Sequence, residues 1–161
     1  MRTQKIYLET TVFNYYFDVD RDAYAYTVRL FDEIREGRYE AYTSDYAVRE
    51  LEDARQEKRD KMIGLIKEFD ITVLEESDAA RELADRYIEN GLFPHKYRTD
   101  ALHVSAATVA GMDMIISLNF RHITKLRTIQ GANAVNTLNG YSTIQIWSPM
   151  EVVENADTKH D

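Results

Sequence analysis

The sequence has no cysteine, only two prolines and only six glycines among its 161 residues. Without cysteine the fold cannot rest on disulfide bonds, so it requires no oxidising compartment. The scarcity of proline and glycine leaves no linker, and no low-complexity tract or internal repeat is present. We therefore expect a single domain over residues 1–161, with its core at about 5–152 and a short flexible C-terminal tail.

Long apolar runs are also missing. No stretch approaches the roughly 20 consecutive apolar residues that a membrane-spanning helix needs, so we expect no contact with a membrane. The N-terminal residues, MRTQKIYLETTVF, lead directly into a strand-like pattern and lack the apolar core of a signal peptide. The expected location is therefore the cytoplasm.

Positive charge is in short supply, because 20 Lys and Arg face 28 Asp and Glu, a net charge of −8. Such a balance counts against non-specific binding to a long polyanion. It does not exclude a nuclease, since acidic residues that surround metal ions lower the formal charge while the metals supply a positive field. No glycine-rich phosphate loop is present, which leaves a nucleotide cofactor without support.

Apolar residues alternate between strand-like and helix-like spacing along most of the chain. This alternation predicts an α/β fold with a mostly parallel sheet covered by helices on both sides. Ligands of such sheets bind outside the carboxyl ends of the strands. The expected strands are residues 5–8, 40–43, 71–74, 114–118 and 143–147. The expected helices are residues 21–36, one capped by Ser44, 59–69, 79–90, 100–110 capped by Thr99, and a short one from about 122.

Polar residues with chemical potential fall at these strand ends. Glu9 directly follows the first strand, and Glu50 lies in the helix after the second. Asp100 opens the helix before the fourth strand, and Asn119 closes that strand. The expected topology therefore brings three carboxylates and an amide toward one edge of the sheet.

The order of these motifs resembles the PIN-domain family, which includes the VapC-type toxins of toxin–antitoxin pairs. The resemblance covers about residues 5–152 and rests on an acid followed by the hydroxyls of Thr10 and Thr11, a mid-chain glutamate, the D-A-L-H-x-x-x-A helix start at Asp100, and a late S-x-N-F. No single motif is specific, but their order and spacing are. The resemblance implies a PIN-like three-layer α/β/α fold with a mostly parallel central sheet.

The same resemblance implies an endoribonuclease that depends on Mg²⁺ or Mn²⁺. Glu9, Glu50 and Asp100 would hold the metal, because three unneutralised carboxylates about 4 Å apart repel by up to about 4 kcal/mol per pair. Asn119 would ligate through water or orient the nucleophile. RNA as substrate, an antitoxin protein as partner and a homodimer are further implications. Thr10 and Thr11 would contribute hydroxyls beside the metal or the substrate.

Two departures from the family pattern keep alternatives open. Glu9 stands where aspartate is usual, and Asn119 stands where aspartate is frequent. A non-catalytic PIN-fold module that binds RNA or a partner through a degraded site is therefore the competing interpretation. A third is an α/β protein that acts on a small phosphorylated molecule through the same metal site.

Each site residue also has an ordinary structural interpretation. Glu9 could cap the following helix, Glu50 could belong to a solvated acidic face, and Asp100 could be a first-turn helix acid. Asn119 could be a plain turn residue. His103, one turn beyond Asp100, is favoured as a hydrogen-bonded structural histidine over a base or a metal ligand.

Basic and aromatic residues suggest where RNA would be bound. The cations near the last two motifs could grip phosphates or form an ordinary solvated surface. Arg98, Arg121 and His122 are the candidates for substrate contact, with Lys96, Lys125 and Arg127 beside them. Simple helix capping is the alternative role for His122. The tyrosine-rich N-terminal third is favoured as core or dimer contact over a platform for unpaired bases.

Overall fold

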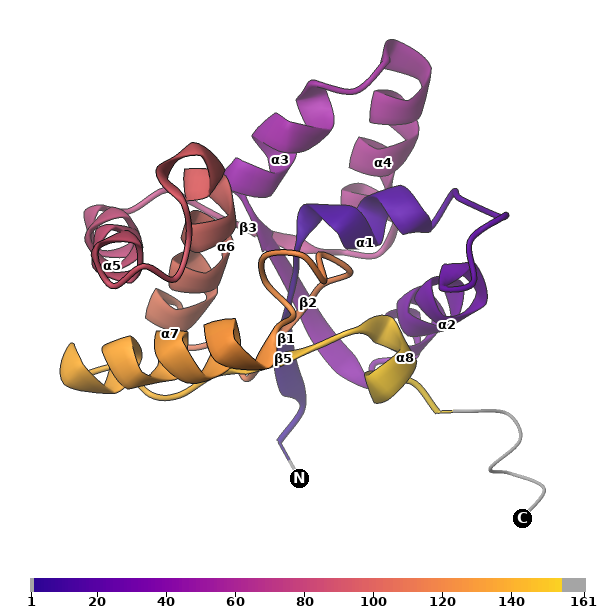
Figure 1. The fold of residues 1–161 in the computed structure, drawn as a ribbon. Helices are drawn as coiled ribbons and strands as arrows, with labels where there is room; N and C mark the ends of the chain where they lie inside the picture. Colours follow the sequence, from indigo (N-terminus) through magenta and orange to yellow (C-terminus); the bar gives the residue numbers. More distant parts are fainter. Residues whose placement is uncertain (1, 155–161) are drawn as a thin grey trace.

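The computed structural model describes residues 2–154 and shows one parallel sheet between two layers of helices (Figure 1). Most of the tail expected after residue 152 lies outside the described residues. No helix within residues 2–154 is long and apolar enough to cross a membrane. The strands are β1 Gln4–Leu8, β2 Tyr39–Ser44, β3 Thr72–Leu74, β4 Met114–Ile116 and β5 Gln145–Trp147. The helices are α1 Thr10–Tyr15, α2 Tyr24–Arg35, α3 Asp45–Glu52, α4 Gln56–Glu68, α5 Asp78–Glu89, the 3₁₀ turn η1 His95–Tyr97, α6 Arg98–Val109, α7 Leu126–Leu138 and α8 Pro149–Val152.

The strand order β3-β2-β1-β4-β5 places a topological switch point between β1 and β4. From β1 the chain winds outward through β2 to β3, then returns to β4 beside β1 and continues to β5. All four strand pairs are parallel, with Leu8 of β1 opposite Ile116 of β4. A switch point opens a crevice at the carboxyl ends of the two central strands. The chain leaves β1 and β4 at that crevice.

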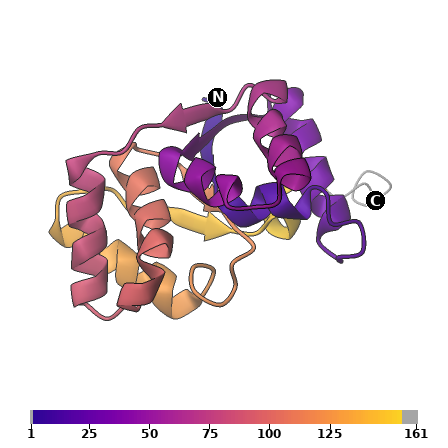
Figure 2. The same cartoon turned by 90° about the horizontal axis from the view of Figure 1, so that it is seen from above.

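The alternation of side chains along β1 separates two apolar cores. Ile6 and Leu8 point into a core shared with α1, α2 and α4, whereas Tyr7 points into the core beneath α5, α6 and α7. Figure 2 shows these two groups of helices on opposite sides of the molecule. Because both faces are buried there, β4 is apolar throughout and β1 is apolar over residues 6–8, as parallel strands between two helical layers require.

The N-terminal aromatic residues belong to the first of these cores. Phe31 packs edge-on against Phe13, Tyr16 and Phe69, with ring centroids 4.9–6.1 Å apart. Phe13 and Phe31 are fully buried. The expectation of core packing rather than base stacking is confirmed for these two rings.

The sheet and most of the helices agree with the sequence prediction, including the side-chain cap from Ser44 to the Ala47 amide. Two local predictions were wrong. Helix α6 begins at Arg98 as a continuation of η1, so Thr99 does not cap it. The helix expected from about residue 122 instead begins at Leu126 and runs to Leu138. Its glycine, Gly131, weakens the sequence signal for a helix, but it lets α7 pack closely on Leu92.

Candidate metal centre

The four residues singled out from the sequence line one pocket at the switch point. This pocket, the carboxylate pocket, has a volume of about 490 Å³ and takes Glu9, Glu50, Asp100 and Asn119 from four separate segments. Its remaining lining residues are Thr10, Thr11, Asn14, Leu51, Asp53, Ala54, Lys58, Met62. The structure therefore brings together all four residues and both threonines.

Glu9 is the most deeply buried of the carboxylates, with 3% of the residue exposed. It occupies the N-cap position of α1, yet its side chain makes no capping hydrogen bond, so the capping interpretation was wrong. Instead Glu9 Oε1 accepts hydrogen bonds from Thr11 Oγ1 at 2.5 Å and from Ser117 Oγ at 2.7 Å. The carboxylate is thereby held across the ends of β1 and β4.

Ser117, the first residue of the S-x-N-F motif, is a site residue whose role was not predicted from the sequence. Its hydroxyl donates a hydrogen bond to Glu9 and accepts one from the backbone amide nitrogen of Asn119 at 3.0 Å. Thr11 acts in parallel, because its hydroxyl accepts from the Leu118 amide nitrogen at 2.9 Å while it donates to Glu9. The hydroxyls of Thr11 and Ser117 therefore link Glu9 to the backbone that follows β4. Each hydroxyl is oriented by the backbone amide from which it accepts a hydrogen bond.

Glu50 projects from the middle of α3, and 38% of its side chain is exposed. Its Oε1 accepts from Thr10 Oγ1 at 2.6 Å and lies 2.5 Å from His103 Nε2. Burial acts to raise the pKa of Glu50, but the hydrogen bond and charge of His103 and the bond from Thr10 outweigh it and lower that pKa below its usual value. Glu50 is therefore an ionised acceptor rather than part of a freely solvated acidic face.

His103 is completely buried on α6, and both of its ring nitrogens are engaged. Nε2 faces Glu50, while Nδ1 lies 2.6 Å from the Tyr7 hydroxyl, which in turn lies 2.6 Å from Ser44 Oγ. Burial opposes a charge on His103, but the Glu50 hydrogen bond and the three nearby carboxylates raise its pKa overall. The prediction of a hydrogen-bonded histidine is confirmed.

Asp100 lies in the first turn of α6 and contacts the residue that closes the pocket. Its Oδ1 accepts from Asn119 Nδ2 at 3.2 Å. Burial, followed by the charges of Glu9 and Glu50, raises its pKa to about 6, although His103 and Asn119 act in the opposite direction. Asn119 also caps the following turn, because its Oδ1 accepts from the His122 amide nitrogen at 3.1 Å.

The donor set fits a hard divalent cation. In each of the three carboxylates, one oxygen accepts protein hydrogen bonds, and the other accepts none from any group within residues 2–154. No Lys or Arg in that range forms an ion pair with Glu9, Glu50 or Asp100. Candidate ligand atoms of Glu9, Glu50 and His103 lie within 4.8 Å of one another, whereas Asp100 lies outside this group and shares only the pocket lining. Because both nitrogens of His103 are already engaged, the free ligands are oxygens, which Mg²⁺ and Mn²⁺ favour.

The candidate substrate residues lie in three different places. Thr10 and Thr11 line the carboxylate pocket, as stated above. Arg98 does not line it, because its guanidinium pairs with Asp85 on α5. Arg121 and His122 line a separate pocket on the other side of the Asn119 turn.

Comparison with known proteins gives the fold. A solved structure described as VapBC2 from Rickettsia felis bound to a DNA fragment from their promoter matches with a TM-score of 0.57 and 11% identity. The match covers 90% of this chain and 98% of that chain. No protein-family model and no curated protein matches the sequence. The likeness, together with the all-parallel five-stranded sheet, confirms the expected α/β/α fold class.

Proposed function

We propose that the protein is a divalent-metal-dependent endoribonuclease that hydrolyses phosphodiester bonds of RNA. The observation that carries this proposal is the trio of carboxylates at the switch point, each with one oxygen fixed by the protein and one oxygen free. The structural likeness to VapBC2 and the sequence resemblance to VapC-type toxins support it.

In this proposal Glu9, Glu50 and Asp100 hold Mg²⁺ or Mn²⁺ through their free oxygens. When bound, the ion supplies positive charge that stabilises the negative charge developing on the phosphate. Ser117 and Thr11 fix the rotamer of Glu9, and His103 with Thr10 fixes that of Glu50. Such supporting contacts lower the cost of assembling a like-charged site.

The proposal extends to the partners that the resemblance implies. As the toxin of a toxin–antitoxin pair, the chain would be inhibited by an antitoxin segment that covers the carboxylate pocket. Leu51, Ala54 and Met62 form the apolar part of its lining, and Lys58 is the cation there. A homodimer is also proposed on the same resemblance.

A second candidate function is a non-catalytic module that binds RNA or a partner. The observation in its favour is the neutral amide of Asn119, which donates to Asp100 where a fourth carboxylate would bind metal. Such a module would bind RNA equally well with or without metal and would not cleave it.

Isothermal titration of Mn²⁺ into metal-free protein, followed by incubation with labelled single-stranded RNA, separates these functions. Saturable binding and cleavage that EDTA abolishes support the nuclease. Binding of RNA without metal uptake would support the module and overturn the nuclease. Turnover of a phosphomonoester without RNA cleavage would indicate the small-molecule enzyme instead.

The affinity for Mn²⁺ should depend on pH through Asp100. With a pKa of about 6, this carboxyl is ionised above pH 6 and protonated below it, where a proton competes with the metal. We expect the affinity to change little between pH 7 and pH 8 and to fall roughly tenfold from pH 7 to pH 5. Titrations at pH 5, 7 and 8 check this, and an affinity that stays constant down to pH 5 would contradict it.

His103 should act as a positioning residue for Glu50. An ionised carboxylate can only accept, so the contact at 2.5 Å requires a hydrogen on His103 Nε2. We expect His103→Asn, which cannot reach Glu50, to weaken Mn²⁺ binding by roughly 10- to 100-fold. His103→Gln places an amide donor near the Nε2 position and should restore most of the affinity.

Tyr7→Phe provides a milder test of the same contact, since it removes only the hydroxyl behind the ring. Thermal unfolding of the metal-free variants shows whether they are folded. A long-range ¹H–¹⁵N NMR spectrum of the wild type should show hydrogen on Nε2 both before and after Mg²⁺ is added. Loss of that hydrogen on metal binding would make His103 a ligand and refute the positioning role.

A further inference from the structure

A second pocket is lined by cations that closely follow Asn119 of the carboxylate pocket in the sequence. This cationic pocket has a volume of about 290 Å³ and contains Arg121, His122, Lys125 and Arg127. The rest of its lining is Gly91, Leu92, Pro94 and Thr128, so no acidic side chain contributes to it. In a chain of net charge −8, a pocket with three cations and no carboxylate is a marked local reversal of charge.

These cations are not engaged with the protein's own acids. Among the ion pairs within residues 2–154, eleven different arginines and lysines take part, but Arg121, Lys125 and Arg127 do not. All three residues are exposed. Three neighbouring exposed cations without an acidic partner are available to an external anion.

His122 of the cationic pocket also belongs to an aromatic stack. The His122 ring lies on the Tyr97 ring with centroids 4.1 Å apart, and Lys96 Nζ lies 5.1 Å from the Tyr97 centroid. Burial, and then the charges of Arg121, Lys125 and Lys96, lower the pKa of His122. The potential around this ring is therefore positive even before His122 itself is considered.

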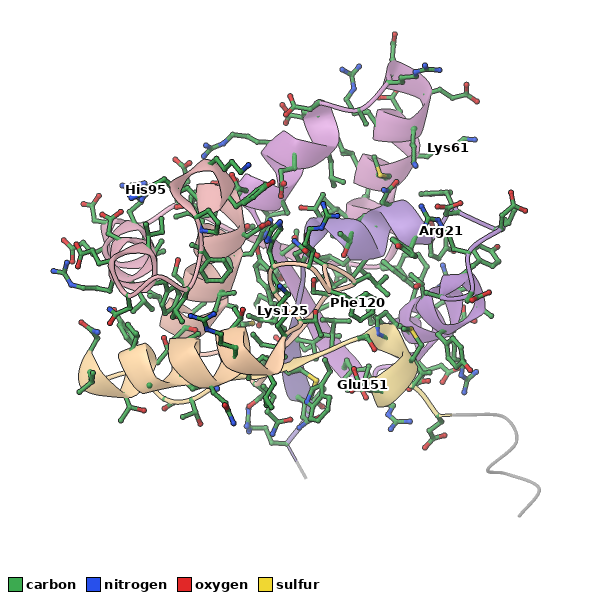
Figure 3. The ribbon with its side chains drawn as sticks, viewed as in Figure 1. Arg21, Lys61, His95, Phe120, Lys125 and Glu151 are labelled. Carbon is green, nitrogen blue, oxygen red and sulfur yellow. The ribbon has the colours of Figure 1, made fainter. Side chains whose placement is uncertain are left out.

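One turn joins the cationic pocket to the carboxylates. The Asn119 carbonyl oxygen accepts from the amides of Ile123 at 3.0 Å and Thr124 at 2.9 Å, and Asn119 Oδ1 accepts from His122. Phe120 and Lys125, labelled in Figure 3, lie at the two ends of this turn. Because Asn119 also contacts Asp100, an anion in the cationic pocket and a phosphate at the carboxylates would lie on either side of one residue.

We propose that the cationic pocket binds a backbone phosphate of single-stranded RNA next to the phosphate that is cleaved. This inference rests on the proposed function for the identity of the second phosphate. A polymer with repeated anions suits two adjacent anion-binding sites better than a single anion does. The Phe120 residue, 48% exposed and next to Arg121, offers a stacking surface that only unpaired bases can use.

Fluorescence anisotropy with a labelled single-stranded RNA, in EDTA so that no cleavage occurs, tests the pocket. We expect the triple variant Arg121→Gln, Lys125→Gln, Arg127→Gln to bind at least roughly tenfold more weakly than the wild type. The slope of log affinity against log salt should become shallower by about 0.7, which is the contribution of one neutralised phosphate on a single strand. The charge-matched control Arg59→Gln, Lys61→Gln, Lys67→Gln removes three cations from α4 and should bind nearly as the wild type does.

The outcomes separate this inference from the proposed function. Equal weakening by the two triple variants would overturn the pocket as a phosphate site, and tighter binding of double-stranded RNA would overturn the single-strand preference. Binding of an acidic peptide but not RNA through these cations would assign the pocket to a protein partner and would also overturn it. If only the Arg121, Lys125, Arg127 triple variant loses RNA binding, and the wild-type protein takes up no Mn²⁺, the pocket is upheld while the nuclease proposal fails.

Discussion

Replacing Asp100 by asparagine should nearly abolish Mn²⁺ binding and, with it, cleavage of RNA. The substitution keeps the size of the side chain and an oxygen for the Asn119 contact, but removes one unit of negative charge from the free ligand oxygens. At about 4 Å with an effective dielectric of about 20, one pair of unit charges contributes about 4 kcal/mol. A loss of roughly a thousandfold in affinity follows from this value. Isothermal titration measures it directly.

The fold of Asp100→Asn should be intact, which makes the result interpretable. Burial and the neighbouring carboxylates raise the pKa of Asp100 to about 6, so its ionised form is unfavourable in the metal-free protein. Between the usual carboxyl pKa and pH 6 the folded state binds more protons than the unfolded state, so stability falls as pH rises through this range. The neutral amide should therefore unfold at the same or a higher temperature than the metal-free wild type at pH 7.

Asp53→Asn supplies the matched control for this variant. Asp53 lines the same pocket and carries the same charge, but it is exposed and lies beyond the three carboxylates assigned to the metal. We expect its removal to change Mn²⁺ affinity less than roughly threefold. Equal effects of the two substitutions would mean that the pocket attracts the ion only by its total charge, and the ligand assignment would fail.

The central strands of the sheet could be predicted because strands that are buried on both faces consist of short apolar runs, which are visible in the sequence. The apolar run after Asp113 and the apolar residues 6–8 of β1 are what strands between two helical layers require, and both strands lie at the centre of the sheet. For helix α7 a short helix was expected from about residue 122, and its start and length were wrong because Gly131 weakens the helical pattern where the helix packs on Leu92. A glycine is read from sequence as a helix breaker, whereas here a neighbouring side chain occupies the space that it leaves.

The residues of the site could be listed from the sequence, but their connections could not. The spacing placed Glu9 and Asn119 at strand ends, and parallel topology then brings them to one edge. The Ser117 bond to Glu9 spans 108 positions along the chain, and the contact of His103 with Glu50 spans 53. Hydrogen bonds between distant residues leave no local pattern, so the roles of Ser117, Tyr7 and Ser44 became visible only in three dimensions.

The amide at Asn119 poses the sharpest question about the site, and converting it to aspartate should have large and opposite effects with and without metal. Without metal, Asn119→Asp replaces the hydrogen bond to Asp100 by a like-charge contact that costs up to about 4 kcal/mol. The midpoint of thermal unfolding should fall by several degrees. With Mn²⁺, the added carboxylate becomes a further ligand, and affinity should rise on the order of 100-fold or more.

Thermal unfolding of Asn119→Asp across a series of Mn²⁺ concentrations measures both effects, because a tighter ligand stabilises the folded state more. Asn119→Ala is the control, since it removes both the Asp100 contact and the His122 cap without adding charge. Weaker Mn²⁺ binding in the aspartate variant would contradict the expectation and show that the amide itself is required to orient Asp100. Tighter Mn²⁺ binding with slower cleavage would mean that the natural asparagine keeps the ion loosely held for turnover. Tighter Mn²⁺ binding with faster cleavage would mean that the natural asparagine restrains an otherwise more active nuclease.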